Sequence, residues 1–256
     1  YRLAAFDNIG STNAEAMARG RDGERGPMWF VTSEQTAGRG RRSRPWIAPR
    51  GNLASSIFEV IDVSPSVAAT LGFAAGLALE AALQRVSVEA SLRAAGSDHM
   101  NYALKWPNDV LAGKQKLAGI LLEAEAVGDG LAVVVGIGTN VVAAPEGTPT
   151  PATSLAAIGV NIGAEELFSE LSDSWARYRG VWDNGRGFGE IRRLWLERAA
   201  GLGQVVAIQS GGSTVEGIFD TIDEAGSLVV RTPDGKRVPI SAGDVYFGSA
   251  KSAGAA

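Results

Sequence analysis

The chain contains no cysteine and a single histidine, His99, among its 256 residues. Without cysteine it can have no disulfide, no thiolate zinc site and no cysteine nucleophile. One histidine also leaves too few partners for a multi-histidine metal site, and it makes a Ser-His-Asp triad improbable. A reducing compartment, the cytoplasm, is compatible with this composition, and catalytic chemistry has to come from other side chains.

The chain also lacks an excess of positive charge, since 24 Lys and Arg against 28 Asp and Glu give a net charge of −4. A general nucleic-acid binder usually needs a basic surface to displace counterions, so DNA is not expected as a partner. The most apolar stretch, Val67–Leu79, is shorter than the ~20 residues that cross a bilayer, and no signal-peptide pattern follows Tyr1. We therefore expect a cytoplasmic protein with a buried helix in this stretch and no membrane partner.

The composition that is present, 45% hydrophobic and 20% charged, is that of a folded protein. A T-x-x-E capping box at Thr12–Glu15 predicts that a helix begins there. The stretch Val88–Tyr102, which holds His99, is longer than a connection needs and is interpreted as a surface insertion. Apolar spacing and turn signals predict strands at 2–7, 28–32, 53–60, 117–124 and 131–135, the last two as an antiparallel hairpin, and helices at 66–84, 164–182 and 188–198.

The sequence changes character at Gln204, where helical periodicity gives way to short β-rich runs separated by glycine turns. This change predicts two domains at 1–200 and 204–248, joined by a linker at 199–203 and followed by a disordered tail at 249–256. The expected fold class is α+β. It combines a mixed, mainly antiparallel sheet packed with helices and a small C-terminal β-barrel-like domain.

One segment, Thr36–Trp46, places four arginines within six positions and intersperses two glycines. The forked donors of arginine fit carboxylates and phosphates, and a glycine-hinged loop can close over a ligand and exclude water. The segment is therefore a candidate lid for anions, with a solvated basic patch as the alternative. A dinucleotide-binding glycine pattern is disfavoured, because Ser43 occupies its third position and Pro45 follows where a helix must begin.

Two further segments carry polar residues at strand ends. Lys105-Trp106-Pro107-Asn108-Asp109 closes a strand-like run with a proline turn, and Lys116 opens the next strand. A lysine at a strand end offsets negative charge on phosphate, while Asn and Asp can position a nucleotide or hold Mg²⁺. Gly136–Asn140 is a glycine-rich strand end whose asparagine could meet a ligand. Taken singly, these segments could be an ordinary turn and a β-bulge, and Ser11-Thr12-Asn13 could serve only to cap a helix.

Taken in chain order, these segments resemble the biotin–protein ligase family. They are Ser11-Thr12-Asn13, Gln35 with Gly38-Arg39-Gly40-Arg41-Arg42-x-Arg44, Lys105 through Asp109, Lys116-x-x-Gly119-Ile120-Leu121, and Gly136-Ile137-Gly138-x-Asn140. The resemblance implies a class II synthetase-like catalytic domain, the biotin–lipoate ligase fold, followed by a small SH3-like β-barrel. It also implies an enzyme that makes biotinyl-5′-AMP and pyrophosphate from biotin and ATP. The biotin would then pass to a lysine of a biotin carboxyl carrier protein, such as the acetyl-CoA carboxylase subunit.

The resemblance implies roles for individual residues as well. The residues expected to act in catalysis are Lys105, Arg39 and Arg41. They would neutralise the negative charge that builds up as the biotin carboxylate attacks the α-phosphate. Biotin is expected to contact Ser11, Thr12, Asn13, Gln35, Gly38, Arg39, Gly40, Arg41, Lys105, Gly119 and Leu121. ATP and the adenylate are expected to contact Arg42, Arg44, Trp46, Asn108, Asp109, Lys116 and Asn140, with Trp46 under adenine and Mg²⁺ bridging phosphate oxygens.

Two departures from the family pattern are visible. The family usually has glycine at the position of Ser43, so the middle of the loop is expected to be stiffer or differently shaped. Some members carry an N-terminal helix-turn-helix repressor domain, whereas this sequence starts at the catalytic strand, so we expect no repressor activity. A monomer or a weak homodimer, which could pair through a sheet edge, is expected separately. Two alternatives remain. One is a lipoate ligase or octanoyltransferase of the same fold, and the other is a binding protein that senses biotin without turnover.

Overall fold

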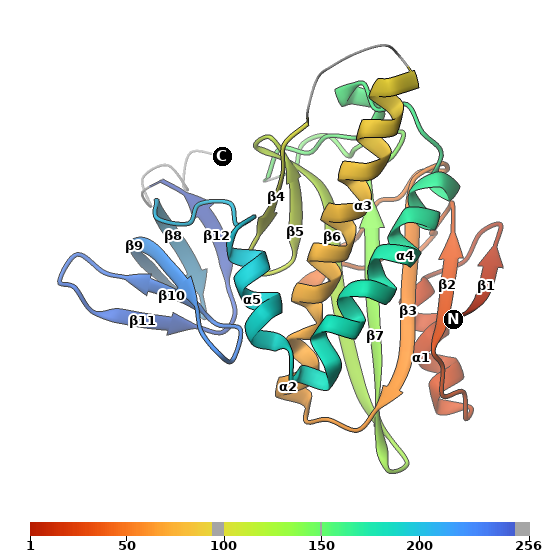
Figure 1. Cartoon of the computed structure of the whole chain (residues 1–256), viewed down its shortest axis with the longest axis horizontal. Helices are drawn as coiled ribbons and strands as arrows, with labels where there is room; N and C mark the ends of the chain where they lie inside the picture. Colours follow the sequence, from red (N-terminus) through yellow and green to blue (C-terminus); the bar gives the residue numbers. More distant parts are fainter. Residues whose placement is uncertain (94–99, 149, 249–256) are drawn as a thin grey trace.

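The computed structural model describes residues 1–93, 100–148 and 150–248, and its larger part is built on one seven-stranded sheet (Figure 1). The strand order is β1-β2-β3-β7-β6-β5-β4, and only the pair β1 and β2 is parallel. This confirms the predicted mixed, mainly antiparallel sheet. The strands are β1 (Arg2–Phe6), β2 (Met28–Thr32), β3 (Leu53–Ile61), β4 (Tyr102–Lys105), β5 (Asp109–Ala112), β6 (Gln115–Val127) and β7 (Gly130–Thr139).

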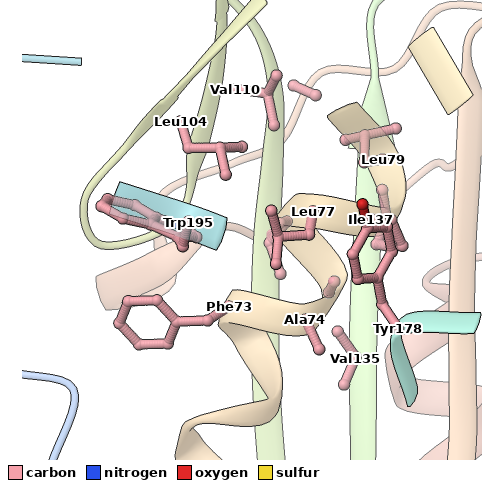
Figure 2. Close-up of a cluster of buried hydrophobic side chains, with 14 of the residues drawn as sticks. Phe73, Ala74, Leu77, Leu79, Leu104, Val110, Val135, Ile137, Tyr178 and Trp195 are labelled. Atoms are coloured by element: carbon pink, nitrogen blue, oxygen red, sulfur yellow. The ribbon is translucent and has the colours of Figure 1, made fainter. Parts of the chain in front are cut away.

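Helices cover both faces of the sheet, because the central strands β3 and β7 are apolar on both sides. Phe58 and Val134 belong to the cluster around α1 (Thr12–Arg21), whereas Ile57 and Val135 belong to the larger cluster around α3 (Leu71–Arg93). The alternation follows from the two-residue period of a strand. Figure 2 shows the larger cluster, in which α3 side chains meet those of β7, α4 (Ala164–Trp182) and α5 (Phe188–Leu196).

The predicted helix at 66–84 is two helices, α2 (Pro65–Ala69) and α3, separated at Thr70. The Thr70 hydroxyl donates to the Val67 carbonyl (2.6 Å) and accepts from Trp182 Nε1 (2.8 Å), so the break is tied into the core. The helix α3 also takes in residues 88–93, which corrects the predicted surface insertion, and Tyr102 begins β4. His99 lies outside the described residues.

The apolar helical segment is longer than the predicted stretch Val67–Leu79, because Pro65–Arg93 is long and apolar enough by composition to cross a membrane. Its most apolar window is, however, 72% buried inside the protein. A helix that is apolar around its whole circumference is typical of the centre of a large core, and α3 is covered by the sheet, α4 and α5. The predicted buried helix is therefore confirmed for a different physical reason.

The C-terminal part is a five-stranded antiparallel sheet with the order β11-β10-β9-β8-β12. Its strands are β8 (Val205–Ser210), β9 (Ser213–Ile222), β10 (Leu228–Arg231), β11 (Arg237–Ile240) and β12 (Asp244–Phe247). We call Val205–Phe247, which contains these strands and the turns between them, the C-terminal unit. Short 3-10 turns elsewhere are η1 (Arg41–Ser43), η2 (Ala156–Ile158) and η3 (Asp183–Gly185).

The C-terminal unit is attached to the edge of the large sheet at β4. The Leu104 amide donates to the Arg198 carbonyl and the Ala200 amide donates to the Leu104 carbonyl, both at 2.8 Å, so the connecting segment extends the sheet. Trp106 Nε1 donates to the Gly226 carbonyl of the C-terminal unit (3.1 Å). The Lys105–Asp109 turn is thus held between the two parts of the chain.

Candidate active site

A cavity of about 410 Å³ gathers the segments that the sequence singles out. It lies on the α1 face of the sheet, beyond the first turn of that helix. Along β7 the side chains of Ala132 and Val134 pack against α1, and Gly136 and Gly138 continue the same face. Since these glycines have no side chains, other side chains can lie against the strand there. The cavity opens between α1, the strands and the basic loop Gly38–Trp46, which we call the lid loop.

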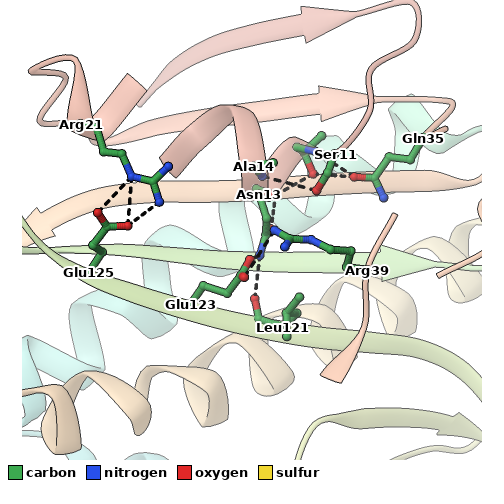
Figure 3. A network of polar contacts seen from close by, with 11 residues as sticks. Ser11, Asn13, Ala14, Arg21, Gln35, Arg39, Leu121, Glu123 and Glu125 are labelled. Atoms are coloured by element: carbon green, nitrogen blue, oxygen red, sulfur yellow. Dashed lines mark hydrogen bonds and ion pairs between the residues drawn. The ribbon is translucent and has the colours of Figure 1, made fainter. Parts of the chain in front are cut away.

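The start of α1 forms one end of the cavity, and it differs from the predicted capping box. Ser11 is the N-cap, and its hydroxyl accepts from the Ala14 amide (3.4 Å). Thr12 therefore does not cap the helix. Its amide and hydroxyl donate instead to Gln35 Oε1 (2.8 and 3.1 Å), which brings two sequence-distant predicted site residues together (Figure 3).

Asn13 is buried at the same end of the cavity and is fully engaged. Its Nδ2 donates to the Leu121 carbonyl (3.2 Å) and to Glu123 Oε2 (2.8 Å) (Figure 3). Its Oδ1 accepts from the Ser56 hydroxyl (2.6 Å). A Cβ at Gly136 would overlap the Asn13 amide, so glycine is required there. The network fixes a polar rim on the α1 side, made of the uncharged Thr12, Asn13 and Gln35 and backed by the Glu123 carboxylate.

The lid loop is a tight hairpin with a left-handed tip. The Gly40 amide donates to the Arg44 carbonyl (2.8 Å), and the Trp46 amide donates to the Gly38 carbonyl (2.9 Å). Arg42 and Ser43 have φ values of 55° and 58°, a region that L residues with a Cβ rarely adopt. A glycine at position 43 would take this conformation without strain, which gives a physical reason for the family's usual residue.

The lid arginines divide between two carboxylates. Arg39 Nη2 lies 3.5 Å from Glu123 Oε1 at the α1 side. Arg42 Nη1 and Arg44 Nη2 lie 2.6 and 3.0 Å from Asp244 Oδ2 on β12. The loop is thus attached at one side to the large sheet and at the other to the C-terminal unit.

The remaining lid arginine, Arg41, is the most buried of the four and reaches the Lys105–Asp109 turn. Its Nη1 donates to Asn108 Oδ1 (3.3 Å) and to the Gly243 carbonyl (3.3 Å). Burial lowers the pKa of Arg41, partly offset by Asp244, but the group keeps its charge because a guanidinium pKa starts above 12.

Lys105 is a second buried cation in the cavity. Burial lowers its pKa, nearby Asp109 raises it, and the positive charge of Lys116 lowers it further. Its Nζ lies 5.5 Å from the centre of the Phe247 ring on β12, while Lys116 Nζ pairs with Asp109 Oδ1 at 2.6 Å. The cavity therefore concentrates positive charge that an anionic ligand would stabilise.

Trp46 lies against the strands at the centre of the cavity. Gly119 on β6 and Gly138 on β7 are directly paired, and a Cβ on Gly138 would stand 2.5 Å from Trp46 Cε2. Lys116 Nζ lies 5.5 Å from the centre of the indole ring. Directly after the end of β7, Asn140 is buried and its Nδ2 donates to the Thr153 carbonyl (3.0 Å). Within the described chain its Oδ1 has no partner, so an acceptor remains for a ligand.

The predicted site residues thus come together, except that Gly38 and Arg42 do not line the cavity. Gly38 begins the lid loop, where a Cβ would stand 2.5 Å from the Trp46 carbonyl oxygen and 2.9 Å from Gln35 Nε2. The Arg42 side chain is 46% exposed and turned to Asp244. Sequence reasoning missed Glu123 and the β12 residues Asp244, Val245 and Tyr246. Strand alternation from Leu121 could have found Glu123, whereas no sequence signal pointed to β12.

The fold and site define a class of protein: a ligase that brings the carboxylate of an acid and a phosphate together under a cationic lid. Residues 20–140 match the biotin/lipoate A/B protein ligase family, and residues 201–248 match the biotin protein ligase C terminal domain. The biotin--[acetyl-CoA-carboxylase] ligase of Paracoccus denitrificans is 40% identical over 93% of this chain and 97% of its own. The chain therefore belongs to the biotin–protein ligase family.

Two further relatives agree with this family. The biotin--[acetyl-CoA-carboxylase] ligase of Mycobacterium tuberculosis is 36% identical over 95% of this chain and 88% of its own length. The solved structure of the biotin protein ligase from Aquifex aeolicus in complex with biotin and ATP has a TM-score of 0.77. It is 23% identical and covers 96% of this chain and 99% of that one, which supports the fold.

Proposed function

We propose that the lid cavity is where this chain acts as an ATP-dependent biotin–[acetyl-CoA-carboxylase] ligase. The enzyme converts biotin and ATP to biotinyl-5′-AMP and pyrophosphate, and then transfers biotin to a lysine of a biotin carboxyl carrier protein. The observation that carries the assignment of the site is that Arg41, Lys105 and Lys116 meet in one cavity, beside the polar rim at the start of α1.

Biotin would bind with its uncharged ring system at the α1 end and its carboxylate toward the cations. Gln35 offers its side-chain amide there, oriented by the bonds that its Oε1 accepts from Thr12. Asn13 is fixed by Glu123 and the Leu121 carbonyl. These neutral hydrogen-bonding groups suit a ring that both donates and accepts but carries no charge. The other biotin contacts expected from the sequence stay a prediction.

The first chemical step joins two anions. A carboxylate oxygen of biotin attacks the α-phosphorus of ATP, the bond to the leaving oxygen breaks, and pyrophosphate departs with the bonding electrons. Lys105 and Arg41 neutralise charge that builds up on the phosphate oxygens, and desolvation strengthens this interaction. Arg39 is 48% exposed and paired with Glu123, so we assign it chiefly to closing the lid over biotin.

The nucleotide would lie on the side of Trp46, Lys116 and Asn140. The unpartnered Asn140 Oδ1 is suited to accept from the adenine amino group. Among the described residues no cluster of three His, Cys, Asp or Glu side chains could hold a metal by itself. Mg²⁺ commonly uses one or two carboxylates together with substrate phosphates, and Asp109 on the cavity wall fits that need. When bound, Mg²⁺ would neutralise phosphate charge.

In the second step the neutral amine of the carrier lysine attacks the acyl carbon of the adenylate and forms an amide bond. AMP leaves with the electrons of the acyl–oxygen bond, and the nitrogen releases a proton to solvent. The lid loop must then admit the carrier. We also propose that residues 1–200 form the catalytic domain and 204–248 the C-terminal domain. The cytoplasmic location, the absence of DNA binding, and the monomeric or weakly dimeric state stay predictions.

Calorimetry with biotin and with lipoate tests the acid specificity directly. The polar surroundings of Thr12 and Asn13, together with the Gln35 side-chain amide, should favour biotin, whose ring makes hydrogen bonds, over the apolar ring and chain of lipoate. We expect saturable biotin binding and at least tenfold weaker lipoate binding, a difference of about 1.4 kcal/mol. Preferential binding of lipoate would contradict the proposal.

A further inference from the structure

The lid loop is attached to the C-terminal unit through a single carboxylate. Asp244, the first residue of β12, pairs through Oδ2 with Arg42 (2.6 Å) and Arg44 (3.0 Å), and its Oδ1 lies 4.0 Å from Arg41 Nη1. The Asp244 side chain is 23% exposed, so solvent screens these pairs only in part. One residue of the C-terminal unit thus contacts three of the four lid arginines.

The position of Asp244 is fixed by its own strand. It lies opposite Gln209 in the β12–β8 pair. The preceding Gly243 approaches β8 so closely that a Cβ there would stand 2.6 Å from Ile208 Cγ2. The Gly243 carbonyl also accepts from Arg41 Nη1 (3.3 Å). Two successive residues therefore engage the lid, one through its backbone and one through its carboxylate.

The charges around Asp244 indicate what this contact does. One carboxylate cannot neutralise three guanidinium groups, so the lid keeps net positive charge for phosphate. Arg42 does not line the cavity, and its pair with Asp244 therefore serves the position of the loop and not the ligand directly. The contact orients the lid and leaves its charge available.

We propose that Asp244 is a positioning residue, a latch by which the C-terminal unit holds the lid loop closed over biotinyl-5′-AMP and slows its hydrolysis. This inference rests on the proposed function. When the lid opens without a carrier, water adds to the acyl carbon, the acyl–oxygen bond to phosphate breaks, and AMP leaves with the bonding electrons. Biotin is regenerated and a proton is released, so ATP is consumed without transfer.

The test follows AMP released by the full chain with biotin, ATP and Mg²⁺ in the absence of a carrier. Asp244→Asn keeps the size of the side chain and removes its charge, so AMP release should become several-fold faster. Asp244→Glu should restore most of the slow release. The matched control is Asp220→Asn, which removes a carboxylate of the same unit that pairs with Arg231 and Arg237 on neighbouring strands. It should release AMP at the wild-type rate.

A second variant keeps the test decisive if Asp244→Asn does not fold. Arg42 lies at the exposed tip of the lid loop, and Arg42→Gln removes its ion pair with Asp244. It should speed AMP release as well, and adding it to Asp244→Asn should give no further increase. Wild-type AMP release by both Asp244→Asn and Arg42→Gln would overturn the latch. Failure of the wild-type chain to form biotinyl-5′-AMP would instead contradict the proposed function.

Discussion

At the scale of single residues, Lys105 is a cation kept in an environment that disfavours its charge. Burial lowers its pKa from the ordinary 10.5, so Lys105 loses its proton at a lower pH than an exposed lysine. Because only the protonated form neutralises phosphate, adenylate formation should fall as pH rises through this lowered pKa. Lys105→Arg remains charged there and should keep its own, slower rate over the same range.

The measurement is the rate of biotinyl-5′-AMP formation against pH for both proteins. A fall in this rate at high pH in the wild type, with no such fall in Lys105→Arg, supports the assignment. The same fall in both proteins would show that another group causes the pH dependence and that Lys105 does not neutralise the phosphate charge.

Most of the residues named from the sequence line the cavity, because their order and spacing follow a family pattern that can be recognised without coordinates. The pattern could not show that Ser11 and not Thr12 caps α1, since two adjacent hydroxyl residues satisfy the same rule. Nor could it place Arg42 outside the cavity, because that depends on the left-handed tip at Arg42 and Ser43.

At the scale of elements, the fit between the lid loop and the β6–β7 pair decides whether the cavity can close. A Cβ on Gly138 would stand 2.5 Å from the Trp46 ring, so Gly138→Ala must displace the indole. We expect at least tenfold slower adenylate formation with little change in Tm, because a strand accepts alanine more readily than glycine. Gly72→Ala is the control, since a Cβ there meets nothing within 4 Å.

The kinetics of the two variants are compared at saturating and limiting ATP, with Tm measured in parallel. Normal adenylate formation by Gly138→Ala would show that Trp46 does not need to contact β7 during the reaction.

The boundaries of the helices and strands were largely predictable, and Ala164–Trp182 agrees with α4 at both ends. The break at Thr70 was not predictable, because it depends on Trp182, which is 112 residues away.

At the scale of the whole molecule, the C-terminal unit completes the cavity through β12 and is held to the large sheet at Trp106. Trp106→Phe removes the hydrogen bond to the Gly226 carbonyl, which should cost about 1 kcal/mol and loosen the β12 wall. We expect a raised KM for ATP together with a lower Tm. Trp29→Phe is the control, because the buried Trp29 Nε1 has no partner in the described chain.

Both substitutions remove the same ring volume, so both should lower Tm, but only Trp106→Phe should change KM for ATP. Equal KM values would show that docking at Trp106 does not shape the site. This docking could not be predicted from the sequence. It depends on contacts such as Trp106 with Gly226, 120 residues apart, and Arg42 with Asp244, 202 residues apart.

The central claim is that Lys105, beside Arg41 under the lid loop, carries the activation of biotin by ATP. The most direct measurement is the formation of biotinyl-5′-AMP by the purified chain and by Lys105→Ala, each with biotin, ATP and Mg²⁺, together with labelling of a biotin carboxyl carrier domain. The wild type should form the adenylate and label the carrier, whereas Lys105→Ala should fold but form no adenylate. Normal adenylate formation by Lys105→Ala would contradict the account.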